Sequence, residues 1–284
     1  MVFLIISILF STLILITFRI FTKFNINNLQ AIIINYITAV ILGIIILNRP
    51  IKSYFTLFNY DWFYYSILIA VFFIITFFLF AISSQKAGIA ITAVSSKVSL
   101  VIPIIASFFI LNEQLSTYKI VGIITACIAF YLTFKKDKKN SNLDLKFIYF
   151  PLLLFVCNGI NDALMKIIET KFVAHNTLLF LTCIFFFAFL IGIITLILKE
   201  KGIKFKNKNI LAGFLLGLIN FGSTYYFLES ITEFDSSVFF PSFNASVVTL
   251  SAIVGYLIFK EKLKPINIIG IVLAVFSIIF IALN

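Results

Sequence analysis

Charged side chains are scarce in this sequence. They make up 12% of its 284 residues, about half of what a soluble domain carries. The chain also has a single His, a single Trp and three Cys. This shortage excludes a soluble enzyme, a nucleic-acid-binding domain and a disordered protein, because each of them needs far more charged or polar residues.

The sequence also lacks the residue patterns that hold cofactors. Its three cysteines, Cys127, Cys157 and Cys183, lie inside apolar runs without the spacing of a metal site or a disulfide pair, and we expect them to be small core residues. A Gly-Lys-Ser/Thr phosphate-binding loop is absent, which excludes an ATP-driven transport domain in this chain. We therefore predict no metal, no cofactor and no catalytic residue, and we do not expect an enzyme.

Apolar residues are abundant instead: 62% of the chain is hydrophobic, with 37 Phe and a mean hydropathy of +1.15. Ten apolar segments of about 18–23 residues follow one another, each long enough to cross a bilayer as a helix. Barrel strands alternate in polarity and give no such runs. The sequence predicts an all-α polytopic membrane protein with ten transmembrane helices, at residues 2–19, 29–47, 62–84, 89–111, 117–134, 147–167, 176–198, 209–229, 237–259 and 265–283.

The chain contains an internal repeat. A shift of 148 positions aligns several of its rarer residues: Thr22-Lys23-Phe24 with Thr170-Lys171-Phe172, Asn28 with Asn176, Glu113 with Glu261, and Gly122 with Gly270. We predict a first five-helix repeat at residues 1–136, a basic linker at 137–148 and a second five-helix repeat at 149–284. Because five is an odd number of crossings, the second repeat must be inverted in the membrane. Inverted repeats build many secondary transporters, with the substrate site near the midplane between the halves.

A Glu follows the fourth segment of each half, in Asn112-Glu113-Gln114-Leu115 and in Lys260-Glu261-Lys262-Leu263. With the ten helices, the two repeats and the glycines Gly122 and Gly270, this pattern resembles the EamA-type branch of the drug/metabolite transporter superfamily. The resemblance covers essentially the whole chain. It implies a secondary carrier, often an exporter, of small metabolites such as amino acids, sugars, nucleotide derivatives or drugs. The family pattern has Gly before each Glu, where this chain has Asn112 and Lys260.

Lys97 is the deepest charge in the sequence, about 12 Å from the start of the fourth segment. An ionisable group in hydrocarbon costs about 2.5–3.5 kcal/mol or more, so its presence indicates a function or a partner. The hydroxyls of Ser95 and Ser96 lie beside it in the sequence. Two interpretations stay open: Lys97 binds an anionic group of a substrate, or it forms a structural ion pair with a carboxylate of a neighbouring helix.

Asp162 is the second buried charge, in the sixth segment. Asn158 and Asp162 are four residues apart and share one helical face with Lys166, and Asn161 lies between them. We expect Asp162 to pair with Lys97 across the bundle, to carry a coupling proton, or to have only a structural role near the interface. The two asparagines are candidates for hydrogen bonds to a substrate.

The second half supplies the remaining candidate site residues. Tyr226 and Glu229 end the eighth segment, and Glu229 binds a cation or a proton if the helix continues for a further turn. If the helix stops at 229, Glu229 belongs to an exposed loop. Asn244 occupies the position equivalent to Ser96, and Lys97 is matched by an alanine. Different polar residues at equivalent positions of the two repeats suit the binding of an asymmetric substrate. Neutral sequence divergence between the repeats explains the difference as well.

The orientation of the chain has two conflicting indications. Of the 22 Lys and Arg residues, 16 lie on the membrane side that carries the linker, five lie on the other side, and Lys97 lies within a segment. The positive-inside rule then makes the linker cytoplasmic and both termini external. The family resemblance implies cytoplasmic termini.

The sequence thus predicts a secondary transporter of a small metabolite, such as an amino acid or organic anion, in a bacterial-type inner membrane. Alternating access, export and protons as the coupling ion are the expected features. The alternatives are a carrier of hydrophobic drugs or lipids and an intramembrane lipid-modifying enzyme. The lipid bilayer and a small molecule are the expected partners, nucleic acid is not, and a monomer is compatible with the sequence.

Overall fold

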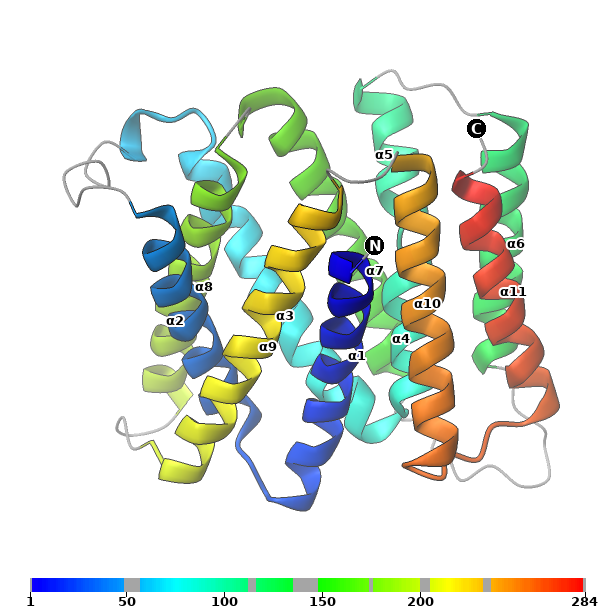
Figure 1. The fold of residues 1–284 in the computed structure, drawn as a ribbon, viewed down its shortest axis with the longest axis horizontal. Coiled ribbons are helices and arrows are strands. Elements are labelled where there is room, and N and C mark those ends of the chain that lie inside the picture. Colours follow the sequence, from blue (N-terminus) through cyan, green and yellow to red (C-terminus); the bar gives the residue numbers. More distant parts are fainter. Residues whose placement is uncertain are drawn as a thin grey trace.

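The computed structural model describes residues 2–48, 57–111, 116–134, 148–173, 176–199, 205–231 and 236–282. These residues are helical apart from short connections, which confirms the predicted all-α class (Figure 1). The helices are α1 (Val2–Lys23), α2 (Asn28–Leu47), α3 (Phe63–Lys86), α4 (Ile89–Val98), α5 (Val101–Leu111), α6 (Thr117–Phe134), α7 (Tyr149–Ile168), α8 (Thr177–Lys199), α9 (Asn207–Ile231), α10 (Ser236–Leu257) and α11 (Pro265–Ala282). A 3₁₀ turn, η2 (Leu57–Asn59), precedes α3, and a π turn, η4 (Glu169–Val173), extends α7.

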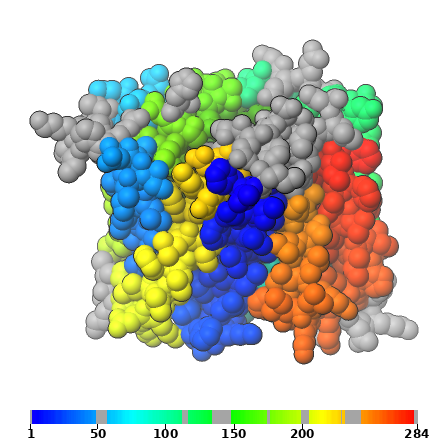
Figure 2. Space-filling view, viewed as in Figure 1, coloured from blue at the N-terminus to red at the C-terminus, as the bar shows by residue number. Residues whose placement is uncertain are grey.

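The described helices are those of a multi-pass membrane protein. Seven spans are long and apolar enough to cross a bilayer, with α4 and α5 counted together, and α6, α10 and α11 offer shorter apolar stretches. Large apolar side chains are exposed on the outer faces, such as Phe109 (73%) and Leu198 (83%), which suits contact with lipid rather than water. Figure 2 shows α1, in blue, lying between α9 and α10, and α1 packs against both.

The fourth predicted segment is the one element that departs from a single helix. It divides into α4 and α5 at Ser99 and Leu100. Pro103 is the third residue of α5 and has no N–H to donate to the Ser99 carbonyl, which accepts from the N–H of Ile102 instead at 2.9 Å. The predicted crossing at 89–111 is confirmed as one span, and the proline accounts for the break within it.

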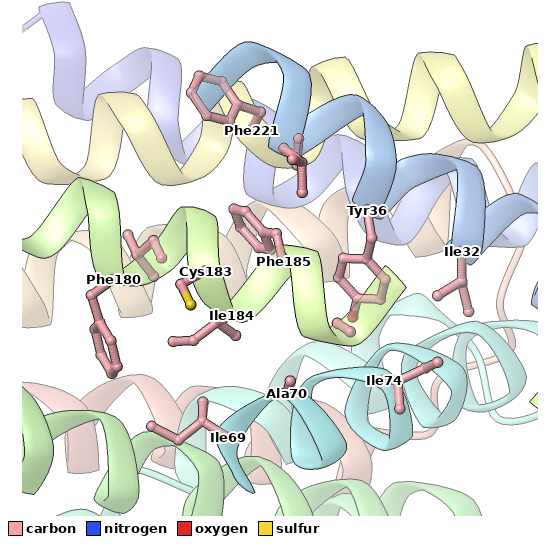
Figure 3. Packing of buried hydrophobic residues seen from close by; sticks show 14 of the residues in the cluster. Ile32, Tyr36, Ile69, Ala70, Ile74, Phe180, Cys183, Ile184, Phe185 and Phe221 are labelled. Atoms are coloured by element: carbon pink, nitrogen blue, oxygen red, sulfur yellow. The ribbon is translucent and has the colours of Figure 1, made fainter. Parts of the chain in front are cut away.

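Two large apolar clusters make up most of the core among the described residues. The larger one includes buried residues of α1, α2, α3, α8 and α9. Figure 3 shows Phe185 of α8 close to Tyr36 of α2, with Ile184 of α8 on the side of Ile69 of α3. The smaller one includes residues of α4, α5, α6, α10 and α11. Each cluster therefore contains helices from both halves of the sequence. In particular, α3 packs mainly against α7 and α8, while α9 packs against α1 and α2.

Helix bounds in the two halves correspond at the 148-residue shift. For example, α6 spans Thr117–Phe134 and α11 spans Pro265–Ala282. The predicted linker, apart from Ile148, and the sequence around Glu113 lie outside the described residues. Of the cysteines, Cys183 lies in the larger cluster as expected, but Cys127 is exposed on the outer face of α6, so the core prediction was wrong for that residue.

Candidate functional site

Lys97 lies in the last turn of α4, immediately before the helix break. Its ammonium group lies 4.6 Å from the centre of the Phe243 ring, which belongs to α10. The Asp162 carboxylate of α7 interacts with it electrostatically. Within the described part of the chain, the Lys97 ammonium makes no hydrogen bond, so its three N–H donors are unused.

Asp162 is held by Asn158, one helical turn earlier on α7. The Asn158 amide nitrogen lies 2.8 Å from Asp162 Oδ2, 2.8 Å from Ser99 Oγ and 3.1 Å from the Ser96 carbonyl oxygen. The two amide hydrogens are shared among these three acceptors. Asn158 therefore joins the carboxylate on α7 to the α4–α5 break.

The break between α4 and α5 frees the Ser96 carbonyl to accept the hydrogen bond from Asn158. In a regular helix the Ser96 carbonyl would accept from the N–H of Leu100, which points instead at the Lys97 carbonyl, 3.5 Å away. The Ser96 carbonyl is thus free for Ser99 Oγ, at 2.6 Å, and for Asn158. Gly159, next to Asn158, allows the close approach of α7, because a Cβ there would overlap the Ile102 side chain.

Ser95 and Asn161 lie near this group but differ in their bonding. The Ser95 hydroxyl is buried and donates to the Ile91 carbonyl at 2.9 Å, so it is satisfied within α4. The Asn161 side chain is 6% exposed, and its oxygen has no hydrogen-bond partner among the described residues. Asn161 is therefore able to accept a hydrogen bond from a ligand, whereas Ser95 must first release its own.

Tyr226 and Glu229 belong to a separate group at the end of α9. The Tyr226 ring stacks on Phe3 and Phe10 of α1, each with a centroid distance of 5.9 Å. Glu229 lies within the helix, which continues to Ile231, and it hydrogen-bonds Tyr225. The exposed-loop interpretation of Glu229 was therefore wrong. Its neighbours Glu233 and Asp235 lie outside the described residues.

Sequence reasoning missed Phe243. This buried residue lies under Lys97, and its ring meets that of Phe227 on α9 at 5.0 Å, so it stands between the Lys97 group and the Tyr226 group. Phe243 is equivalent to Ser95 under the repeat shift, which is the signal that would have found it. Asn244, the next residue on α10, is half-buried beside it.

Residues 145–283, which contain α7 to α11, match the model of the EamA-like transporter family. This match confirms the resemblance to EamA-type drug/metabolite transporters. Similarity to a transporter family over residues 145–283 favours a membrane transporter as the class of this multi-pass chain.

Two further similarities extend over nearly the whole chain. An uncharacterized protein of Haemophilus influenzae (strain ATCC 51907 / DSM 11121 / KW20 / Rd) is 29% identical over 281 residues, which are 97% of this chain and 95% of the relative. A solved structure, described only as the crystal structure of a protein, has a TM-score of 0.64 at 13% identity. It covers 98% of this chain and 94% of its own, and it supports the fold alone.

Proposed function

We propose that the protein is a secondary carrier that exports a small anionic or zwitterionic metabolite by alternating access. The observation that carries the proposal is the Lys97–Asp162 pair at the α4–α5 break, where the ammonium group has no hydrogen bond within the described residues. Buried charges in membrane proteins are costly and mark substrate or ion pathways. A broken helix beside such charges is typical of transporter binding sites.

Lys97 is the proposed site for the substrate's carboxylate or phosphate. Its charge lies about 12 Å into the span, too deep to reach water at the membrane face. The EamA-type branch that the chain resembles includes carriers of amino acids and nucleotide derivatives, and an ammonium group that lacks a hydrogen-bond acceptor suits the anionic group of either one.

Asp162 is the proposed partner of a substrate amine or of a coupling proton. One of its oxygens accepts from Asn158, and the other has no hydrogen bond among the described residues. The free oxygen of Asn161 lies on the same helix, one residue before it. The hydroxyl of Ser96 and the amide of Asn244 are proposed as further hydrogen-bonding groups, with Ser95, Tyr226 and Glu229 as more distant members of the pathway.

The test is a thermal-shift screen of the purified protein in detergent against amino acids, organic acids, sugars and nucleotides. A ligand at 100 times its dissociation constant stabilises the protein by about 2.7 kcal/mol, which gives a measurable rise in melting temperature. We expect the rise to vanish in Lys97→Ala and to persist in Lys171→Ala, a control at an exposed lysine. A rise that persists in Lys97→Ala would place the site elsewhere.

A carrier of hydrophobic drugs or lipids is the second candidate. Two groups of ring contacts favour apolar ligands: Tyr226 of α9 stacks on Phe3 and Phe10 of α1, and the next residue, Phe227, contacts Phe243 of α10. Stabilisation by lipophilic cations or lipids, without stabilisation by amino acids, organic acids, sugars or nucleotides, would support this second candidate. The protein would then be a bacterial-type exporter of hydrophobic compounds.

A further inference from the structure

Glu261 lies in the connection between α10 and α11, but its carboxylate binds the start of α4. Oε1 accepts from the Ile89 N–H at 2.6 Å, and Oε2 accepts from the Ala90 N–H at 3.3 Å. The first N–H groups of a helix have no partner within the helix, and its N-terminus carries a partial positive charge. A carboxylate accepts hydrogen bonds from these N–H groups and neutralises the partial positive charge. Glu261 of the second half therefore caps a helix of the first half.

The surrounding backbone is shaped to admit this carboxylate. A Cβ on Gly88 would lie 2.8 Å from Glu261 Oε1, and a Cβ on Gly255 would lie 2.5 Å from Oε2. Gly88 also has a φ of 102°, which side-chain-bearing residues rarely adopt. Lys260 adopts a φ of 51° immediately before Glu261. The family pattern has Gly at this position, and the turn that it would make is formed here by a lysine.

Arg19 of α1 contacts the end of α3 in the same region and interacts with Glu261. Its guanidinium donates to the Ser84 carbonyl at 3.0 Å and to the Gln85 carbonyl, and its positive charge acts on Glu261. Gln85 in turn exchanges side-chain hydrogen bonds with Asn28 of α2, at 2.9 and 3.1 Å. The α1–α2, α3–α4 and α10–α11 connections are thereby joined at one end of the molecule, the lower end in Figure 1.

We propose that Glu261 is a conformational lock, which closes the path to Lys97 from the membrane side that carries the linker. The proposal rests on the proposed carrier function. Ile89 begins the short helix α4 and Lys97 lies in its last turn, so the α10–α11 connection lies directly at the linker-side end of the helix that holds Lys97. Alternating access moves packed bundles of helices against each other. The Glu261 contact joins the α10–α11 connection to the end of the α3–α4 connection, and α3 belongs to the larger apolar cluster whereas α10 and α11 belong to the smaller one. When the two clusters separate to open the linker side, this contact has to break.

The experiment measures access without any substrate. In a variant whose three cysteines are replaced, Ser96→Cys reports on the site, and Ser141→Cys, in the linker, identifies the linker side. Vesicles are treated with a membrane-impermeant thiol reagent from either side. We expect Glu261→Ala to raise the linker-side labelling rate of Cys at 96 by roughly tenfold, the effect of losing one charge-assisted hydrogen bond, with no increase from the other side.

Glu113→Ala is the matched control, because Glu113 is the equivalent residue of the first half in the sequence repeat and follows the C-terminal end of the fourth predicted segment, whereas Glu261 binds the N-terminal end of that segment. Linker-side labelling should stay unchanged in it. An unchanged rate in Glu261→Ala, or an equal rise in both variants, would overturn the lock. Where Glu261→Ala does not fold, Glu261→Gln keeps the side-chain shape and gives the same test. Loss of ligand binding in Lys97→Ala is a separate result, so failure of the lock and failure of the carrier function are distinguishable.

Discussion

The side-chain amide of Asn158 lies 2.8 Å from Asp162 Oδ2 and fixes the carboxylate at the α4–α5 break. This contact joins a charge on one helix to the interrupted backbone of another, and it makes the position of Asp162 depend on a neutral neighbour. Three expectations about stability follow from this contact and its neighbours, and a fourth concerns the connection that carries Glu261.

Asn158→Ala should destabilise the protein by about 1–3 kcal/mol, because Asp162 and the Ser96 carbonyl lose a buried donor. Thermal unfolding in detergent measures this change. Asn59→Ala, at an exposed amide in η2, serves as the control and should leave the melting temperature unchanged. Equal stability of the two variants would show that the Asn158 amide is dispensable.

Lys97→Met leaves Asp162 without its compensating charge, and we expect a loss of about 3 kcal/mol in unfolding free energy. Asp162→Asn in the same chain removes the stranded carboxylate and should restore most of that loss. A double-mutant cycle from denaturation curves gives the coupling between the two residues. Purely additive effects would mean that the two charges do not interact.

Gly159→Ala should destabilise the protein by about 1–3 kcal/mol, because the new methyl group overlaps Ile102 where α7 meets α5. Ile102→Val in combination should recover part of this loss by making room. The measurement is the melting temperature of both variants. Failure of the valine to help would argue against this packing.

Lys260→Gly should stabilise the protein by about 1 kcal/mol, because glycine adopts the left-handed conformation that costs a lysine energy. Lys262→Gly is the control in the same connection; Lys262 has no such conformation and should gain nothing. Chemical denaturation compares the two. A gain of the same size in both would assign the effect to charge rather than to backbone strain.

Much of the fold could be predicted from the sequence because hydrophobic length alone identifies membrane helices. The segment at 117–134 coincides with α6. The extent of the interruption at Ser99 and Leu100 could not be predicted from the sequence. Pro103 predicts a kink in the preceding turn but does not determine how many residues leave the helix.

The candidate site was predicted in part. Lys97 and Asp162 were identified because charges in an apolar chain are conspicuous, and the structure brings them within electrostatic reach. Phe243 was missed because, as one Phe among 37, it differs from the others only in its equivalence to Ser95 under the repeat shift. Glu261 was singled out only as a repeated residue, because its partners lie in the other half of the chain, at a separation that local patterns do not encode.

The distribution of both core clusters over the two halves has a consequence for biosynthesis. The main packing partners of α3 are α7 and α8, which are translated after the whole linker and two further crossings. Until then the large apolar face of α3 must remain in lipid or in contact with the insertion machinery. Ribosomes that stall between α6 and α7 would therefore leave an inserted but unassembled half, which quality-control proteases can recognise.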